Sequence, residues 1–153
     1  KLILNNKSNF NKDTDLLLYM AARSENINII KKSYNKKIIL IDRFTDSTIA
    51  YQHYGMGVDL NLIETLNKYL LKNIKVSFTF LNIVNKKNLQ KRLKQRKSLN
   101  RYDKFKMSFY NKVQKGFLSL SKKQKNKYQL INSNLEIDKN EKLILSKIDR
   151  LIK

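Results

Sequence analysis

Four consecutive apolar residues, Ile38 to Ile41, constrain the fold more than any other feature of the sequence. A short run of β-branched and aliphatic residues predicts a strand that is buried on both faces. Asp42 and Arg43 follow at its carboxyl end, the edge where ligands bind in an open parallel sheet. The carboxylate can face a hydrated Mg²⁺, and the guanidinium can hold a phosphate in a bidentate fork. For two residues alone, an exposed charge pair is the simpler interpretation.

Helical and strand patterns alternate along the rest of the chain. We expect Asp13 or Thr14 to cap the first helix and Asp59 to cap a later one. The alternation predicts an α/β fold in one domain over 1–153, a parallel sheet with helices on both faces. The predicted elements are helices over about 13–34, 59–70, 85–97, 104–124 and 143–152, a loop that passes into a helix over 45–52, and strands over 38–41, 76–84 and 128–131.

The composition excludes several classes of site. The chain has 153 residues, of which 41% are hydrophobic, enough for a packed core. It has no cysteine, so disulfides, thiolate metal sites and cysteine nucleophiles are excluded, and a reducing cytoplasmic location is the default. The single His53 excludes a multi-histidine metal cluster. No apolar run approaches the roughly 18 residues of a membrane span, and no signal peptide is visible.

The net charge of +21 has two interpretations of equal weight. It favours binding of polyanions such as nucleic acid or nucleotides. However, proline is absent, glycine numbers 3, and lysine, asparagine and isoleucine abound. These preferences follow AT-rich codons, so a base-biased genome would produce the same composition. The charge alone therefore identifies no partner.

Two motifs resemble those of one enzyme family. Residues 42–52 read Asp-Arg-Phe-Thr-Asp-Ser-Thr-Ile-Ala-Tyr-Gln and resemble the DR(Y/F/H)-x-x-S-x-x-AYQ signature of thymidylate kinases. Residues 16–23, Leu-Leu-Leu-Tyr-Met-Ala-Ala-Arg, resemble the LLF-x-A-x-R helix of that family. The resemblance runs from about Asp15 to the C-terminus. It implies a three-layer, P-loop kinase-like fold that transfers the ATP γ-phosphoryl group to dTMP with Mg²⁺, giving dTDP for dTTP synthesis. The family is commonly dimeric, so a homodimer is also implied.

The resemblance implies roles for individual residues. Tyr19 and Arg23 are four residues apart on one helical face, which by itself is typical of an amphipathic helix. In the family, the aromatic residue stacks on thymine and the arginine contacts the base edge. Arg43 would hold the dTMP phosphate, and Asp42 would approach Mg²⁺ through water. The remaining implied dTMP contacts are Ser47, Thr48, Gln52 and Tyr51, the last selecting deoxyribose.

A basic segment over about 92–103 resembles the mobile lid of the family. Arg92, Arg96 and Arg101 match the arginines of its R-x-x-x-R-x-x-x-x-(D)R-x-E pattern. Asp103 replaces the glutamate of that pattern. Mobile arginines that close over the ATP phosphates stabilise developing charge, so Arg96 and Arg101 are predicted to be catalytic. A solvated basic helix face is the alternative interpretation.

One motif of the family is missing. No G-x-x-x-x-G-K-[ST] occurs, so no loop of this sequence would cradle the β- and γ-phosphates of ATP. We therefore expect a chain truncated at its N-terminus, equivalent to the C-terminal two thirds of the domain and incomplete at the N-terminal side of the sheet. We also expect no useful kinase activity from these residues alone. Measurable dTDP formation would contradict that expectation.

Three alternatives stay open. A deoxynucleoside kinase usually has Glu-Arg-Ser where Asp42-Arg43-Phe44 stands, and thymidine and dTMP would separate the two enzymes as ligands. A basic nucleic-acid-binding module would show affinity that falls steeply with salt. A decayed remnant would have no function. We expect dTMP and ATP as partners, and neither a membrane nor nucleic acid.

Overall fold

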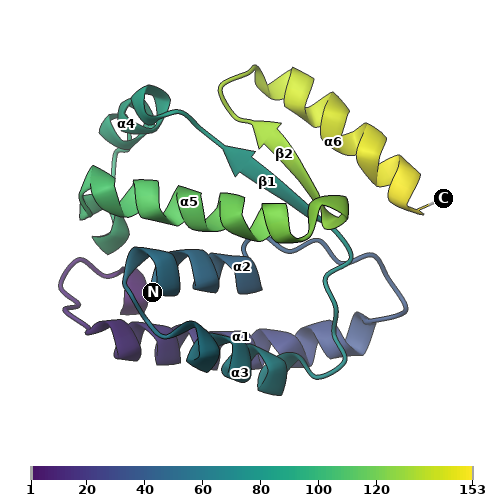
Figure 1. Cartoon of the computed structure of the whole chain (residues 1–153), viewed down its shortest axis with the longest axis horizontal. Coiled ribbons are helices and arrows are strands. Elements are labelled where there is room, and N and C mark those ends of the chain that lie inside the picture. The colour runs from purple at the N-terminus through teal and green to yellow at the C-terminus, as the bar shows by residue number, and fades with distance from the viewer. Residues whose placement is uncertain (1, 153) are drawn as a thin grey trace. The chain divides into compact units, whose positions relative to one another are not determined.

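The computed structural model describes residues 2–152, which divide into two compact units. The first unit runs to residue 76 and continues over 100–120, and the second takes 77–99 and the chain from 121 onward. The helices of the first unit are α1 (Lys12–Ser33), α2 (Thr45–Thr48), a π-helix (Ile49–Gly55), α3 (Leu60–Leu71), a 3-10 turn (Arg101–Lys104) and most of α5 (Met107–Lys123) (Figure 1). The second unit contains β1 (Thr79–Ile83), α4 (Lys86–Lys94), β2 (Tyr128–Asn132) and α6 (Ile137–Ile152).

The start of α1 differs slightly from the prediction. The side chain of Asn11 accepts a hydrogen bond of 2.8 Å from the backbone amide of Thr14 and so caps the helix. The prediction that Asp13 or Thr14 is the cap was therefore wrong. Asp13 instead lies in the first turn, where its carboxylate interacts favourably with the helix dipole. The predicted cap of α3 is confirmed, since Asp59 accepts a hydrogen bond from the amide of Asn61.

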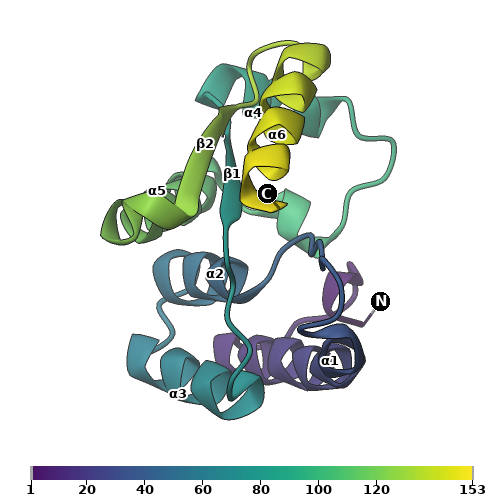
Figure 2. The ribbon, with the colours of Figure 1, turned by 90° about the vertical axis from the view of Figure 1, so that its right-hand side faces the viewer.

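The core of the first unit forms where α1, the π-helix and α3 meet. α1 and α3 pack against each other, and Figure 2 shows them side by side. Buried side chains from α1 recur at helical spacing and include the charged Asp15 and Arg23 beside apolar residues. Each fully buried aliphatic side chain contributes roughly 1.5 to 3 kcal/mol relative to an exposed one. The central cluster consists of Leu16, Met20, Ile49, Val58 and Ile63.

Glycine lets α5 approach the π-helix closely. A Cβ atom on Gly116 of α5 would lie 2.7 Å from the ring of Tyr54. A Cβ atom on Gly55 would lie 2.5 Å from the ring of Phe109. Any larger residue at either position would push the two helices apart. These contacts hold the π-helix, which carries Ala50, Tyr51 and Gln52 at the end of the motif, against the long helix α5.

The second unit contains a two-stranded parallel sheet. β1 and β2 pair in register, with Thr79 opposite Tyr128 and Ile83 opposite Asn132. The predicted strands at 76–84 and 128–131 are therefore confirmed, the first in a shorter form. The connection between the strands contains α4 and α5, as a parallel crossover requires. Leu81 and Ile131 are the buried residues of the pair.

The predicted strand at Ile38–Ile41 is not formed. This segment has no regular secondary structure, and Ile38 and Leu40 are 66% and 79% exposed. A strand exists through hydrogen bonds to a neighbouring strand. Within residues 2–152 the only paired strands are β1 and β2, which bond to each other. An apolar run without a strand partner therefore forms no strand here and stays exposed.

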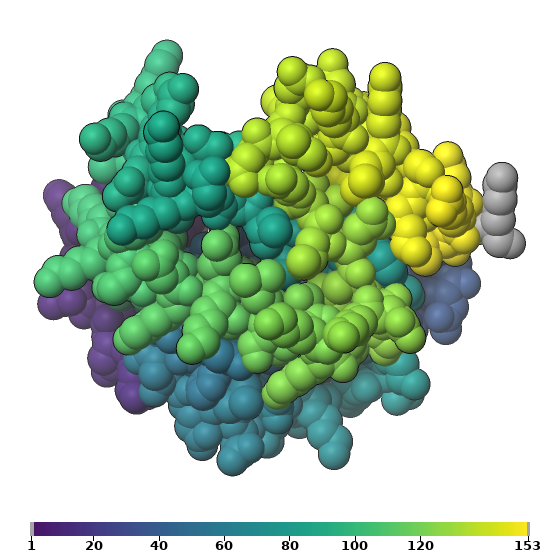
Figure 3. Space-filling view, turned by 45° about the horizontal axis from the view of Figure 1, so that its top comes forward, coloured from purple at the N-terminus to yellow at the C-terminus, as the bar shows by residue number. Residues whose placement is uncertain are grey.

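The closing helix α6 is amphipathic but lies at the surface of its unit. Several of its apolar residues are exposed, among them Ile137 at 82% and Leu145 at 51%. The yellow segment in Figure 3 shows this helix open to the outside. Over residues 2–152, no helix combines the length and the apolar character that crossing a membrane requires.

Candidate functional site

Arg23 joins three segments of the first unit. This side chain of α1 is only 9% exposed, yet it carries a guanidinium group. It donates hydrogen bonds of 2.6 Å to Thr48 Oγ1, 2.6 Å to Asn67 Oδ1 and 3.0 Å to the carbonyl of Phe44. The guanidinium also lies over the Phe44 ring, 5.3 Å from its centre. The two motifs that the sequence predicts to act together are therefore in direct contact.

Arg23 keeps its positive charge at neutral pH although it is buried. Burial lowers the pKa of Arg23 to about 10, and the nearby carboxylate of Asp46 acts in the opposite direction. The guanidinium therefore stays protonated at neutral pH and remains a donor only. Any ligand atom that meets it must be a hydrogen-bond acceptor.

Arg43 lies at the turn that precedes α2. Its backbone has φ +61°, in the left-handed region that non-glycine residues rarely adopt. Strain of this kind concentrates at functional sites, where the surroundings hold it in place. The guanidinium lies over the ring of Tyr51, 5.1 Å from its centre. Partial burial would lower the pKa of Arg43, but Tyr51, Asp42 and Tyr19 outweigh that effect and raise it.

Tyr19 and Tyr51 face a third tyrosine. The ring of Tyr102 lies edge-on to Tyr19 at 6.3 Å and to Tyr51 at 5.8 Å between ring centres. Tyr51 also meets Phe109 and Phe117 of α5. Burial raises the pKa of Tyr19, although a hydrogen bond with Tyr102 partly offsets the rise. The two aromatic residues that the motifs predict as nucleotide contacts therefore belong to one aromatic cluster.

A buried carboxylate underlies this cluster. Asp15 is 0% exposed and accepts a 2.7 Å ion-paired hydrogen bond from Arg101 and a 3.2 Å hydrogen bond from Tyr102 Oη. Neither Asp15 nor Tyr102 was among the residues that the motifs predict. Asp15, Tyr19 and Arg23 follow one another at intervals of four on α1, and that spacing is the signal that could have indicated Asp15.

The other predicted dTMP contacts occupy different depths on the same segment. Gln52 is 1% exposed and donates a 3.3 Å hydrogen bond to Tyr102 Oη, so it supports the cluster from within. Thr48 is 3% exposed and is bonded to Arg23. Ser47 is partly exposed beside it on α2. Of these three, only Ser47 has an appreciably accessible side chain.

The predicted lid arginines have different surroundings. Arg101 belongs to the first unit, where its two terminal nitrogens donate to Asp15 and to the carbonyl of Phe10. Its hydrogen bond to Asp15 raises the pKa of Arg101. Arg92 and Arg96 belong to the second unit, where both are exposed and Arg92 donates to the carbonyl of Ser133. The ion pair of Arg101 differs from the open position expected of a mobile lid arginine.

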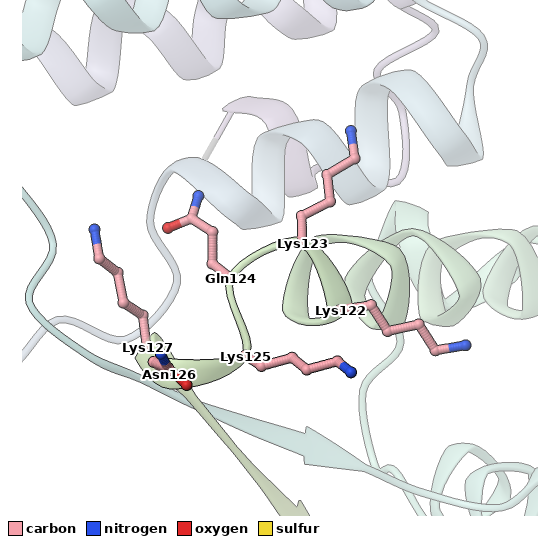
Figure 4. Close-up of a pocket in the computed structure, with 6 residues that line it drawn as sticks. All are labelled: Lys122, Lys123, Gln124, Lys125, Asn126 and Lys127. Atoms are coloured by element: carbon pink, nitrogen blue, oxygen red, sulfur yellow. The ribbon is translucent and has the colours of Figure 1, made fainter.

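A basic hollow of about 530 Å³ lies elsewhere, at the turn between α5 and β2. Four lysines, Gln124 and Asn126 line it, and in Figure 4 Lys122 and Lys125 extend toward one side while Lys123 and Lys127 extend toward another. Its lining contains no aromatic side chain on which a base could stack. None of the predicted nucleotide contacts lines this hollow.

The motif at residues 42–52 contains two carboxylates, Asp42 and Asp46, of which Asp42 is the more exposed. Within residues 2–152, no three histidine or acidic side chains gather into a metal cluster. Asp42 offers a single exposed carboxylate next to Arg43. Mg²⁺ often keeps most of its waters and binds one or two carboxylates together with substrate phosphates. The donor set therefore fits an ion that arrives with a nucleotide, held by Asp42 through water.

Comparison with known proteins gives one consistent result. A family model described as thymidylate kinase matches residues 1–144. A thymidylate kinase of Wolbachia pipientis (strain wPip) is 33% identical over 136 residues, which are 88% of this chain and 64% of that protein. The thymidylate kinase of Mycoplasma capricolum is 35% identical over 146 residues, 90% of this chain and 67% of that protein.

A solved structure agrees with the sequence matches. The crystal structure of thymidylate kinase from Ehrlichia chaffeensis superposes with a TM-score of 0.70 at 32% identity, covering 96% of this chain and 69% of that chain. This likeness confirms the predicted α/β fold class. The chain thus spans about two thirds of the length of the relatives it matches.

Proposed function

The chain belongs to the thymidylate kinase family, and we propose that the protein transfers the γ-phosphoryl group of MgATP to dTMP, giving dTDP. The residues described here would supply the dTMP side of that reaction. Phosphoryl transfer demands mainly positioning and charge neutralisation from a protein. The proposal therefore depends on whether these residues can hold a thymine, a deoxyribose and a phosphate in fixed places.

The observation that carries the proposal is the hydrogen bond between Arg23 and Thr48. It connects α1, whose Tyr19 would stack on the base, with residues 43–52, which would hold the rest of the nucleotide. Arg23 can only donate, so it favours the O4 acceptor of thymine over the amino group of cytosine at the same position. The terminal nitrogens of Arg23 already donate to Thr48, Asn67 and the Phe44 carbonyl, so thymine O4 would share one of these donors.

The aromatic residues supply the apolar contacts. Tyr19 would stack on thymine, which contributes roughly 1 to 3 kcal/mol per base. Tyr51 would lie beside the sugar and disfavour a 2′-hydroxyl. Its position is supported by edge-on contacts with Phe109 and Phe117. Ser47, Thr48 and Gln52 would complete the polar surroundings, Ser47 by direct contact and the other two largely by holding their neighbours.

The arginines would neutralise the phosphates. Arg43 would hold the dTMP phosphate, and the strain of its backbone supports a functional role. Bound Mg²⁺ would neutralise charge on the transferring phosphoryl group, and Asp42 would orient it through water. Arg92 and Arg96 would act on the ATP phosphates, whereas Arg101 is ion-paired with Asp15. A cytoplasmic location, where both nucleotides occur, and a homodimer complete the proposal.

Isothermal titration of the chain with four ligands tests the proposal. We expect dTMP to bind more tightly than dCMP, because Arg23 offers donors only, and more tightly than thymidine, because Arg43 holds the phosphate. We expect a smaller difference in affinity between dTMP and dUMP, roughly 10- to 200-fold at most, because the two ligands differ by one methyl group. Arg43→Ala should abolish the preference for dTMP over thymidine, whereas Arg150→Ala on α6 should not. Equal binding of dTMP and dCMP would contradict the proposal, and tighter binding of thymidine would favour a deoxynucleoside kinase.

A further inference from the structure

Tyr102 occupies the space between two predicted nucleotide contacts. Its ring meets Tyr19 of α1 on one side and Tyr51 of the π-helix on the other. It is 6% exposed, and the rings of Phe105 and Phe109 close further sides of it. The separation of Tyr19 and Tyr51 is therefore set by a side chain that is itself buried.

The hydroxyl of Tyr102 fixes this ring through hydrogen bonds with two elements, α1 and the π-helix. It donates to Asp15 on α1 at 3.2 Å and accepts from Gln52 on the π-helix at 3.3 Å. One hydroxyl thus bridges the two elements that carry the base and sugar contacts. Since Asp15 is 0% exposed, loss of this bond would leave a buried carboxylate oxygen without that donor.

Local structure holds Tyr102 and Arg101 in place. Asn100 and Asp103 form a reciprocal capping box, in which the Asn100 side chain accepts from two backbone amides and Asp103 accepts from the amide of Asn100. Tyr110 of α5 donates a 2.8 Å hydrogen bond to the carbonyl of Tyr102. The replacement of the expected glutamate by Asp103 is therefore compatible with an ordered turn. This part of the predicted lid is therefore held in a fixed position by hydrogen bonds.

Arg101 strengthens that anchor through charge. Its ion pair with Asp15 is 2.7 Å long, and the two side chains are 13% and 0% exposed. The other terminal nitrogen donates to the carbonyl of Phe10, just before α1. Both bonds tie the 3-10 turn to the beginning of the helix that carries Tyr19 and Arg23.

We propose that Asp15, Arg101 and Tyr102 are positioning residues that hold Tyr19 and Tyr51 at the spacing required for a thymine nucleoside. This inference rests on the proposed function and adds to it a role that the motifs do not assign. It makes Arg101 the fixed end of the lid, so that only the segment before it would move. It also predicts that the cluster affects binding of the base and the sugar, and not binding of the phosphate.

Titration with dTMP and with thymidine separates the two roles of the cluster. Tyr102→Phe keeps the ring and removes the hydroxyl. We expect it to weaken binding of both ligands by the same factor, about three- to ten-fold, because the hydrogen bonds to Asp15 and from Gln52 are lost. The matched control is Tyr54→Phe, which removes a similar hydrogen bond to Ser119 in the same unit and should leave both affinities unchanged. Arg43→Ala should weaken dTMP alone.

A second variant keeps the test valid if single changes impair folding. Asp15→Asn combined with Arg101→Gln replaces the ion pair by a neutral amide pair and leaves no buried charge uncompensated. It too should weaken both ligands equally. Amide hydrogen exchange of the ligand-free variants should rise in residues 49–55 and in the first turns of α1, while α3 keeps its protection.

Three results would overturn the inference. If the double variant or Tyr102→Phe weakens dTMP but not thymidine, the cluster acts on the phosphate, as a lid arginine would. If both affinities and the exchange rates are unchanged, the cluster positions nothing. If the wild-type chain binds neither ligand, the proposed function itself fails. This failure is seen with the wild-type chain alone, whereas failure of the inference is seen only in the variants.

Discussion

Arg23 and Thr48, 25 residues apart in the chain, are joined by a 2.6 Å hydrogen bond between two buried side chains. The bond ties α1 to α2 and connects the two motifs that the sequence has in common with thymidylate kinases. Because the donor is charged and buried, its partner matters for both stability and recognition.

Thr48→Val tests this bond. Valine has nearly the same shape and removes only the hydroxyl, so one donor of Arg23 loses a buried acceptor. We expect the free energy of unfolding to fall by about 1 to 3 kcal/mol, measured by urea denaturation. Thr45→Val is the matched control, since the hydroxyl of Thr45 bonds to the neighbouring Asp46 and its loss should cost little. Equal effects of the two substitutions would contradict the structural role of the Arg23 bond.

Alkaline pH should destabilise the protein through Tyr102. Burial, followed by its interactions with Tyr19 and Asp15, raises the pKa of Tyr102 above the ordinary tyrosine value of 10.0. In the unfolded chain this hydroxyl loses its proton near pH 10, while the folded protein retains it. The folded state then binds more protons, so stability is complete below pH 10 and falls above it.

The contribution of Tyr102 is isolated by comparing variants. The decline in unfolding free energy between pH 9 and 11 should be shallower in Tyr102→Phe than in Tyr54→Phe. Arg23 has a lowered pKa of about 10 and acts in the opposite direction, but equally in both variants. Parallel declines would show that Tyr102 does not retain its proton in the folded state.

Gly116→Ala should loosen the packing of α5 on the π-helix. The added methyl group would lie 2.7 Å from the Tyr54 ring, close to the base of that side chain, where it cannot swing away. Overpacking of this kind costs about 1 to 3 kcal/mol. Lys115→Ala, at the exposed neighbouring position, is the control and should change thermal stability little. A Gly116→Ala variant that unfolds at the wild-type temperature would refute this packing.

Leu40→Ser distinguishes the observed conformation from the predicted strand. Leu40 is 79% exposed, so its replacement should change the free energy of unfolding by less than about 0.5 kcal/mol. Leu16→Ala, at a fully buried position, should cost about 2 to 5 kcal/mol. A large loss for Leu40→Ser would mean that this segment is buried in solution after all.

Features that depend on local sequence were predictable. The extent of α1, the cap at Asp59 and the strands β1 and β2 follow from spacing and residue type within a few positions. The segment at Ile38–Ile41 was not, because strand formation depends on a partner that its own residues do not specify.

The site divides in the same way. Tyr19, Arg23, Arg43, Thr48 and Tyr51 could be found because two motifs contain them. The pair of Asp15 and Arg101 could not, because 86 residues separate them and neither motif links them. Burial of an aspartate beside an arginine is decided by tertiary packing, which periodicity does not reveal.

The most direct test of the dTMP site is a crystal structure of the chain with dTMP. We expect thymine stacked on Tyr19 with O4 toward Arg23, and the phosphate beside Arg43. The control is the same experiment with dCMP, which should give no ordered base at that place. A nucleotide bound only at the lysine-lined hollow of residues 122–127, or a thymine remote from Arg23, would contradict a dTMP site formed by Tyr19, Arg23 and Arg43.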